Sequence, residues 1–265
     1  NLYECAEKGF SKKYIFLYSG NIFRPLWTYS AEKKGSQIEL LPRGIFNEMK
    51  LKYPKSFDPD WQGFCIMTWP KFYCWNICSK KFLIEVTTNK PEIKLLNFHT
   101  YFKDLKINLD IPSKSISVFS YEEHRLHHGM STMGDYQNEN LNLIANFYND
   151  ILELLNKNNI TMIIKRKKIN KNDTKKNKFL FNLLKEKNNV VFCNPDVSVE
   201  SISQQTLGTI SLPFSSAAHV STNYNKPTIF YDPTKWVNVD DPAACGIRLI
   251  NSKAELSKWI ANINI

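Results

Sequence analysis

The chain has 265 residues, of which 43% are hydrophobic and 23% are charged, a composition typical of a globular protein. This excludes a wholly disordered chain, a collagen-like chain and a small disulfide-stapled protein, and the length predicts one large domain or two smaller ones. The formal net charge is +10, but residues 157–187 hold eleven of the basic residues and only two acids, with no aromatic residue among the lysines before Phe179, which does not favour nucleic-acid binding.

The first part of the sequence begins with a β-α-β pattern, the building block of a parallel sheet. A buried strand is expected over residues 13–19, a helix over 25–34 and a second strand over 37–41. Residues 42–80 are rich in proline and aromatic residues and do not read as regular elements. Further along, residues 82–86 are expected to form a strand, and residues 88–114 to be irregular.

From residue 115 onward, strands and helices alternate at regular spacing. The expected strands cover residues 115–120, 160–164, 190–193, 209–212 and 228–231. The expected helices cover residues 141–156, 179–187, 198–205, 217–224 and 255–260. This alternation predicts a doubly wound parallel sheet. The fold class is therefore α/β, with two Rossmann-like domains, residues 1–114 and 115–265, facing a cleft.

Several kinds of segment are missing from the sequence. No apolar run approaches the roughly 18 residues of a membrane-spanning helix, and no stretch reads as a signal peptide, so we expect a cytoplasmic protein. The chain opens with Asn1 rather than Met, which suggests a fragment. Cys74 and Cys78 lie four positions apart without a matching second pair, so no zinc site is expected there.

Three groups of candidate ligand-binding residues follow predicted strands, where ligands bind in open α/β sheets. Pro213-Phe214-Ser215-Ser216 leads from a strand into a helix, so its amides and hydroxyls suit a phosphate, although Ser215 can equally serve as a plain helix cap. Lys165 and Lys167 suit an anionic group or form a solvated basic turn. Asp232 can accept hydrogen bonds from a ribose or a base, or can cap its own turn.

Catalytic candidates are carboxylates and a histidine in two other segments. Glu122, Glu123 and His124 lie in a polar loop and suit acid–base work or anion binding, with a metal bound by His124 and His128 as the rival interpretation. Asp60 is one of several acids that suit a general base facing the cleft. Ser19-Gly20-Asn21 follows the first strand as a weak candidate ligand loop, because it matches neither a dinucleotide fingerprint nor a P-loop.

The second part of the sequence resembles a family of bacterial surface-carbohydrate biosynthesis transferases. The motifs that carry this resemblance, in order, are Val118-Phe119, His124-Arg125, Ile163-Ile164-Lys165-Arg166-Lys167, Ser211-Leu212-Pro213-Phe214-Ser215-Ser216-Ala217 and Lys226-Pro227-Thr228-Ile229-Phe230-Tyr231-Asp232-Pro233. The sequence departs from the family pattern after Phe119, where Ser120-Tyr121-Glu122-Glu123 replaces an aspartate-valine-any-proline stretch, and at Ala217, where the family has threonine.

The resemblance implies a GT-B glycosyltransferase whose first domain takes the acceptor and whose second domain binds the nucleotide sugar. Its relatives use CMP-activated acidic keto-sugars, such as Kdo or sialic-acid-like nonulosonates. On that basis Ser215 and Ser216 would hold the CMP phosphate, Arg125, Lys165 and Lys167 would face the anionic donor, and Asp232 would lie near the nucleotide.

Such a reaction requires a CMP-sugar donor and a glycan or glycolipid acceptor, and it needs no metal or other cofactor where cations and helix dipoles stabilise the leaving phosphate. Peripheral association with the inner membrane or with other assembly enzymes is a further expectation. The alternatives are a UDP- or GDP-sugar transferase and a non-catalytic nucleotide- or carbohydrate-binding module.

Overall fold

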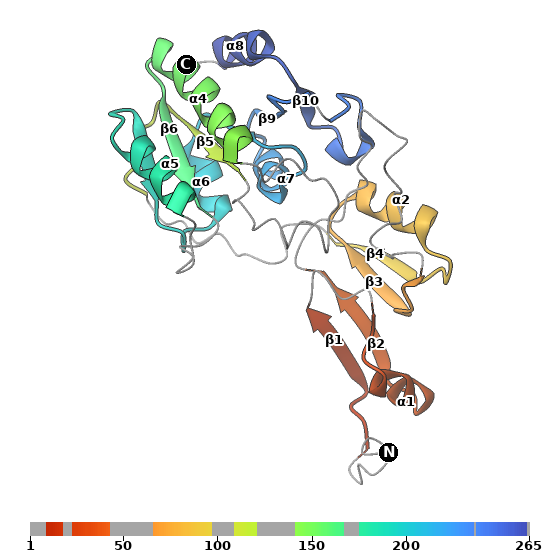
Figure 1. Cartoon of the computed structure of the whole chain (residues 1–265). Helices are drawn as coiled ribbons and strands as arrows, with labels where there is room; N and C mark the ends of the chain where they lie inside the picture. The colour runs from red at the N-terminus through yellow and green to blue at the C-terminus, as the bar shows by residue number, and fades with distance from the viewer. Residues whose placement is uncertain are drawn as a thin grey trace. The chain divides into compact units, whose positions relative to one another are not determined.

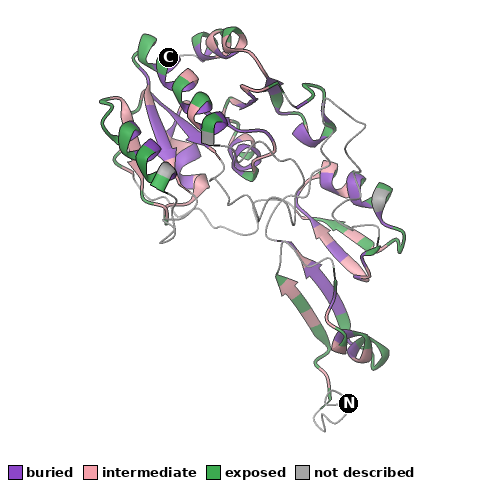
Figure 2. Ribbon diagram, in the orientation of Figure 1, coloured by how far each residue is buried: buried purple, intermediate pink, exposed green. Residues whose placement is uncertain are grey.

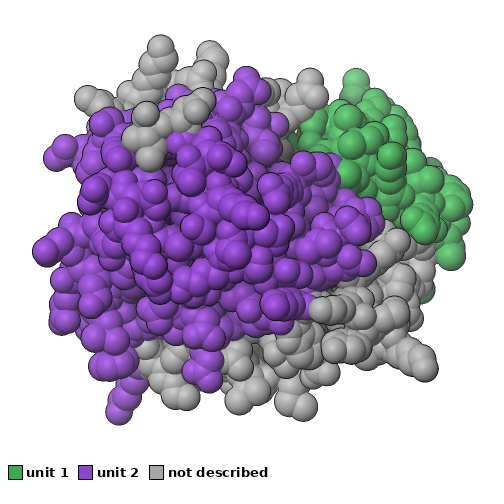
Figure 3. All heavy atoms as spheres, turned by 90° about the horizontal axis from the view of Figure 1, so that it is seen from above, with its two compact units in different colours: residues 1–101 green, residues 102–265 purple. Residues whose placement is uncertain are grey.

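The computed structural model describes residues 9–17, 23–42, 66–96, 109–120, 141–166, 175–235 and 237–263. The chain divides into two compact units, Asn1–Tyr101 and Phe102–Ile265 (Figure 3). The division lies before the expected boundary at 114/115. Leu109 and Ile111 explain the difference, because they pack on the cluster around Phe119, and the Leu109 amide donates to Oε1 of Gln205 at 2.9 Å.

Unit 1 contains a four-stranded parallel sheet in the order β1-β2-β3-β4. Its strands are β1 (Lys13–Leu17), β2 (Gln37–Leu41), β3 (Lys71–Cys74) and β4 (Glu92–Leu95), and its helices are α1 (Trp27–Lys33) and α2 (Ile77–Val86). The predicted β-α-β start is confirmed. The strand predicted over residues 82–86 is wrong, because this segment lies in α2, where the Asn76 side chain accepts from the Ser79 amide at 2.7 Å and caps the helix.

The two faces of the unit 1 sheet differ in chemistry, because successive side chains of a strand point to opposite faces. One face supplies the apolar core, in which Leu40, Phe72 and Trp69 are almost fully buried. Most of β2 is coloured as buried in Figure 2. The other face carries Glu39, which is only 1% exposed. Lys13 and Lys71 each bind its carboxylate through Nζ at 2.8 Å.

Unit 2 contains a six-stranded, fully parallel sheet in the order β10-β9-β8-β5-β6-β7. Its strands are β5 (Ser115–Phe119), β6 (Thr161–Lys165), β7 (Val190–Cys193), β8 (Gly208–Ser211), β9 (Thr228–Tyr231) and β10 (Arg248–Ile250). Its helices are α4 (Leu141–Lys157), α5 (Lys175–Lys185), α6 (Val199–Gln205), α7 (Ser216–Asn223) and α8 (Lys253–Asn262), with a short 3-10 helix η5 (Pro242–Ala244) (Figure 1).

This strand order is that of a doubly wound sheet. The chain starts at the central strand β5, builds outward through β6 and β7, and then returns to the other side of β5 with β8, β9 and β10. The order therefore reverses between β5 and β8, and ligands of such sheets bind outside the carboxyl ends of the strands at that point. Helices α4, α5 and α8 contribute to the main core, on the sheet face that holds Ile116 and Ile210, and α6 and α7 pack on the opposite face.

Gly208 allows β8 and the chain before β9 to approach closely. A Cβ atom at this position would lie 2.7 Å from the backbone oxygen of Pro227. We expect Gly208→Ala to lower the free energy of unfolding of unit 2 by about 1–3 kcal/mol, because the strands must separate to admit the methyl group. Urea unfolding followed by circular dichroism measures this, and an unchanged midpoint would show that the strands separate without cost.

Candidate functional site

The candidate site is the carboxyl edge of the unit 2 sheet. Because its strands are parallel, the residues that end them or directly follow them lie along one edge. The described candidates at this edge are Lys165, which ends β6, Pro213, Ser215 and Ser216, which follow β8, and Asp232, which follows β9. Of these, the β8 segment lies at the reversal between β5 and β8, where the sheet geometry favours a ligand.

The turn from β8 into α7 has an unusual backbone. Phe214 adopts a left-handed conformation with φ of +63°, which is uncommon for a residue with a bulky side chain. Its ring packs on that of Phe230 in β9, with 5.9 Å between the centroids. This contact holds the turn in shape, so that Ser215 becomes the N-cap of α7 and Ser216 its first residue.

Ser215 is a helix cap, as one interpretation of the sequence predicted. Its Oγ accepts a hydrogen bond from the Ala217 amide at 3.3 Å. Ser216 is exposed at the first position of the helix. The first turn of a helix presents amide donors without intrahelical acceptors and a positive dipole end, so the same geometry also suits a phosphate or carboxylate.

A buried network of hydroxyl groups fixes α7 against the sheet beneath this turn. Thr209 of β8 donates to Ser221 of α7 at 2.8 Å, and its Oγ1 lies 2.7 Å from that of Ser117 in β5. Ser221 is also bonded to Ser203 of α6 at 2.7 Å. All four side chains are fully buried. The sequence signal for this network is a polar residue within an otherwise apolar strand, as at Ser117 in β5 and Thr209 in β8.

At the end of β6, Lys165 and Arg166 make contacts on opposite faces of the sheet. Burial lowers the pKa of Lys165, although Cys193, Asp196 and Glu200 partly offset this effect. The Arg166 guanidinium lies over the ring of Phe181 in α5, 4.3 Å from its centroid. Arg166 was not among the predicted site residues. Its guanidinium plane lies at the carboxyl edge of the sheet and is held by stacking on the Phe181 ring.

Asp232 is fully buried and organises its own loop. One carboxylate oxygen accepts from the amide and hydroxyl of Thr234, and the other accepts from the Val237 amide at 2.8 Å. This geometry is the turn-capping alternative that the sequence left open. Both carboxylate oxygens accept hydrogen bonds from this turn, and contact of Asp232 with a nucleotide stays a prediction.

His219 is a buried titratable residue that was not among the predicted site residues. It lies one turn into α7, is 6% exposed, and packs edge-on against Phe230 at 5.9 Å between centroids. Burial lowers its pKa to about 4. Its Nε2 atom has no hydrogen-bond partner among the residues that the structure describes. The imidazole is therefore neutral at physiological pH.

The remaining predicted residues lie outside the part of the chain that the structure describes. They are the catalytic candidates Asp60, Glu122, Glu123 and His124 and the binding candidates Ser19, Gly20, Asn21, Arg125 and Lys167. The rival metal site at His124 and His128 also lies there. Within the described ranges, no three His, Cys, Asp or Glu residues are grouped as metal ligands, and no helix is both long and apolar enough for a membrane span.

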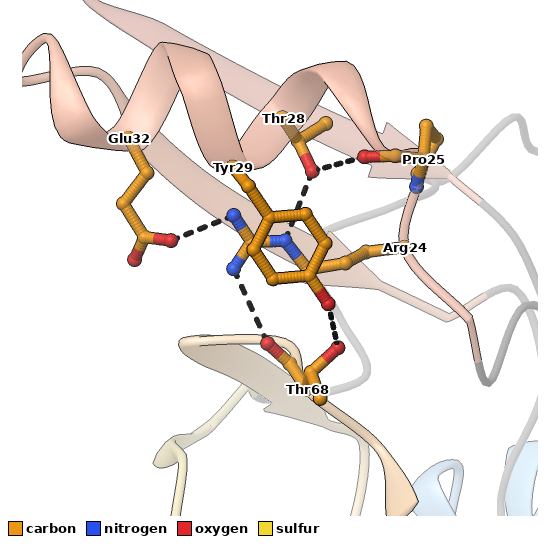
Figure 4. Close-up of polar contacts among 6 residues, drawn as sticks. All are labelled: Arg24, Pro25, Thr28, Tyr29, Glu32 and Thr68. Carbon is orange, nitrogen blue, oxygen red and sulfur yellow. Dashed lines mark hydrogen bonds and ion pairs between the residues drawn. The ribbon is translucent and has the colours of Figure 1, made fainter.

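Arg24 of unit 1 lies close in sequence to the predicted Ser19–Asn21 loop, but its guanidinium serves the fold. It donates to Thr28 Oγ1 at 2.9 Å, to the Thr68 carbonyl at 3.2 Å and to Glu32 at 2.6 Å (Figure 4). The Tyr29 ring stacks on it at 3.9 Å. This buried cation joins α1 to the segment before β3 through these contacts.

Comparison of the sequence with protein families gives one match over most of the chain. The model of a family described as "Polysaccharide biosynthesis PFTS motif protein" matches residues 3–260. If the letters PFTS are read as amino acids, Pro213-Phe214-Ser215-Ser216 differs from them only by serine in place of threonine. No curated protein shows significant sequence similarity to the chain.

Solved structures with a similar fold include two epimerases and a transferase. The alignment with the UDP-GlcNAc 2-epimerase of Rickettsia bellii covers 99% of this chain and 67% of the epimerase chain, with 11% identity and a TM-score of 0.58. The enzyme of the same name from Methanocaldococcus jannaschii was solved with UDP-GlcNAc and UDP. Its alignment covers 95% of this chain and 68% of the epimerase chain, with 13% identity and a TM-score of 0.55.

The third structure is the pneumococcal O-GlcNAc transferase GtfA, solved with UDP and GlcNAc. The alignment covers 94% of this chain and 49% of the transferase chain, with 9% identity and a TM-score of 0.52. At such identities the likeness shows the fold alone. It confirms the predicted fold class, an α/β protein with two Rossmann-like parallel-sheet domains.

Proposed function

Because the chain belongs to the polysaccharide biosynthesis PFTS motif protein family, we propose that it is a glycosyltransferase of surface-polysaccharide assembly that uses a nucleotide-activated sugar. One observation carries this proposal. The family's motif tetrapeptide, Pro213–Ser216, forms the turn between β8 and α7, at the reversal of strand order beside β5. That is the place where doubly wound sheets bind nucleotides.

The donor phosphate is proposed to bind at the start of α7. The hydroxyls of Ser215 and Ser216 and the amides of the first helical turn would donate to its oxygens. In the reaction, the bond from the sugar's anomeric carbon to the phosphate oxygen breaks, and a bond to the acceptor oxygen forms. The helix N-terminus stabilises the charge that develops on the leaving phosphate.

The other edge residues have supporting roles in this proposal. The ammonium of Lys165 would lower the cost of bringing an anionic donor to the edge. Asp232 would hold the loop 232–237 in the shape that borders the nucleotide. A base must take the proton of the acceptor hydroxyl, and Asp60, Glu122, Glu123 and His124 remain the predicted candidates for this step.

Two donor classes are proposed. A CMP-activated acidic keto-sugar follows from the sequence resemblance, and its carboxylate would add a second anion for Lys165, Lys167 and Arg125. A UDP-sugar is the second candidate, because the M. jannaschii epimerase and the pneumococcal transferase are described in complex with UDP. The acceptor is proposed to be a glycan or a glycolipid.

A nucleotide panel tests the proposal and separates the donors. We expect either CMP or UDP to raise the melting temperature of the chain by several degrees at about 100-fold excess over Kd, because a ligand that binds only the folded state stabilises it by about 2.7 kcal/mol under these conditions. Adenosine monophosphate serves as the control, and GDP tests the remaining donor class. Stabilisation by GDP alone would favour a GDP-sugar.

Product analysis then separates a transferase from a binding module. Incubation with the matching nucleotide sugar is expected to release the free nucleotide through slow hydrolysis or transfer. Nucleotide binding without any turnover would indicate the non-catalytic module. If no nucleotide changes the melting temperature, the proposed function is wrong.

A further inference from the structure

A groove between α4 and α5 lies on the helical layer of unit 2, away from the motif turn. Its volume is about 560 Å³. The apolar lining comes from Ala145 and Leu152 of α4 and from Phe179 and Leu183 of α5, and Lys175 and Lys187 also line it. Nothing in the proposed chemistry at Ser215 and Ser216 uses this groove.

Helix α5 is apolar on more than the face that packs on the sheet. Leu180, Phe181 and Leu184 are buried in the core of unit 2, as expected for a helix of a doubly wound fold. Phe179 and Leu183 are nevertheless 66% and 43% exposed. They are four residues apart and therefore share one face of the helix. A helix in water gains nothing from displaying them, so this face is suited to an apolar partner.

The surroundings of these two side chains are basic. Lys175, Lys178, Lys185 and Lys187 are exposed in the same segment, against one exposed acid, Glu186. Residues 157–187 hold eleven basic residues and two acids, whereas the rest of the chain is nearly neutral. The four exposed lysines therefore lie in the same segment as the exposed apolar side chains, and this combination is complementary to an anionic surface.

We propose that α5 docks this protein on the surface of an anionic lipid bilayer. Phe179 and Leu183 enter the boundary between head groups and acyl chains, and the lysines around them bind lipid phosphates, with their aliphatic stems along the apolar surface. Each lysine near an anionic surface adds to the attraction. The helix lies on the membrane and does not span it. This inference does not depend on the proposed transfer reaction.

Vesicle co-sedimentation of the whole chain tests the proposal. We expect binding to phosphatidylcholine vesicles that contain about 30% phosphatidylglycerol, weak binding to pure phosphatidylcholine, and release at about 0.5 M salt. The double variant Phe179→Ser/Leu183→Ser is expected to bind at least about tenfold more weakly, because the apolar insertion is lost. Val239→Ser, which changes another exposed apolar residue of unit 2, is the control and is expected to bind like the wild type.

A second variant tests the charge term separately. Lys175→Gln/Lys187→Gln keeps the apolar side chains and is expected to weaken binding at low salt but not at high salt. All four side chains are exposed or lie at the groove rim, so the circular dichroism melting curves are expected to match the wild type. Wild-type protein that does not sediment with anionic vesicles, or a serine variant that sediments like the wild type, would overturn the proposal. An acidic protein partner for this groove would then be the next candidate.

Discussion

Replacement of both Ser215 and Ser216 by alanine is expected to weaken nucleotide binding at least about tenfold. Each hydroxyl that donates to a charged phosphate oxygen contributes about 1.5–3 kcal/mol, and 1.4 kcal/mol corresponds to a factor of ten in Kd. The amides at the start of α7 remain, so some binding is expected to persist. Isothermal titration calorimetry with CMP and with UDP measures the change.

The same double variant also removes a helix cap, so its effect on stability has to be separated from its effect on binding. Loss of an N-cap costs about 1 kcal/mol. Ser252 offers a matched control, because it caps α8 in the same unit by accepting from the Glu255 amide at 3.3 Å. Ser252→Ala is expected to lower stability similarly and to leave nucleotide binding unchanged. If the Ser215/Ser216 variant also loses stability but keeps the nucleotide affinity of the wild type, these serines only cap the helix, and the proposed nucleotide site is wrong.

Most elements of unit 2 could be predicted, because its buried strands and amphipathic helices alternate with clear periods. The strand over residues 190–193 and the strand over 228–231 have the predicted bounds. β10 was missed, since a run of three residues, Arg248–Ile250, carries no period of its own. Its neighbour β9 supplies the partner that makes it a strand.

Unit 1 was harder to predict for a different reason. Residues 82–86 read Phe-Leu-Ile-Glu-Val, a run that suits a strand in isolation. The cap at Asn76 and the burial of Phe82 and Leu83 beside exposed Ile84 show that the helical period decides the structure. β3 lies within residues 42–80, which are rich in proline and aromatic residues, so its short strand pattern does not stand out.

The position of the candidate site followed from the sequence, but its hydrogen bonds did not. Strand ends identify Lys165, Ser215 and Asp232 as edge residues, because parallel strands share a carboxyl edge. The direction of the Asp232 carboxylate depends on Thr234 and Val237, which fold back on it. The bond between Thr209 and Ser221 depends on how close α7 approaches the sheet. Such contacts are set by packing, which a local pattern does not record.

Unit 1 is expected to lose about 2–3 kcal/mol of stability as the pH falls from 4.5 toward 2. Burial raises the pKa of Glu39, but the bonds from Lys13, Lys71 and Tyr73 outweigh burial and lower the pKa to about 2. A carboxylate whose pKa is lower in the folded state stabilises the fold above its unfolded pKa and loses that contribution on protonation. The lower end of the expected loss, about 2 kcal/mol, allows for the screening of the ion pair by solvent around Lys13, whose side chain is 43% exposed.

Glu39→Gln is the decisive variant for this prediction. At pH 7 we expect it to lower the free energy of unfolding by a similar 2–3 kcal/mol, since the amide cannot pair with the two ammonium groups, and to lose most of the acid dependence. Glu92→Gln is the matched control, because Glu92 contacts Lys71 and Lys94 on the same sheet but is 58% exposed, so its pairs contribute less than about 1 kcal/mol. Urea unfolding at pH 3 and pH 7, followed by tryptophan fluorescence, measures both, and Trp27, Trp69 and Trp75 of unit 1 contribute to the signal together with the chain's three other tryptophans. If Glu39→Gln keeps the acid dependence of the wild type, another carboxylate carries it, and the two lysines then hold Glu39 without stabilising unit 1.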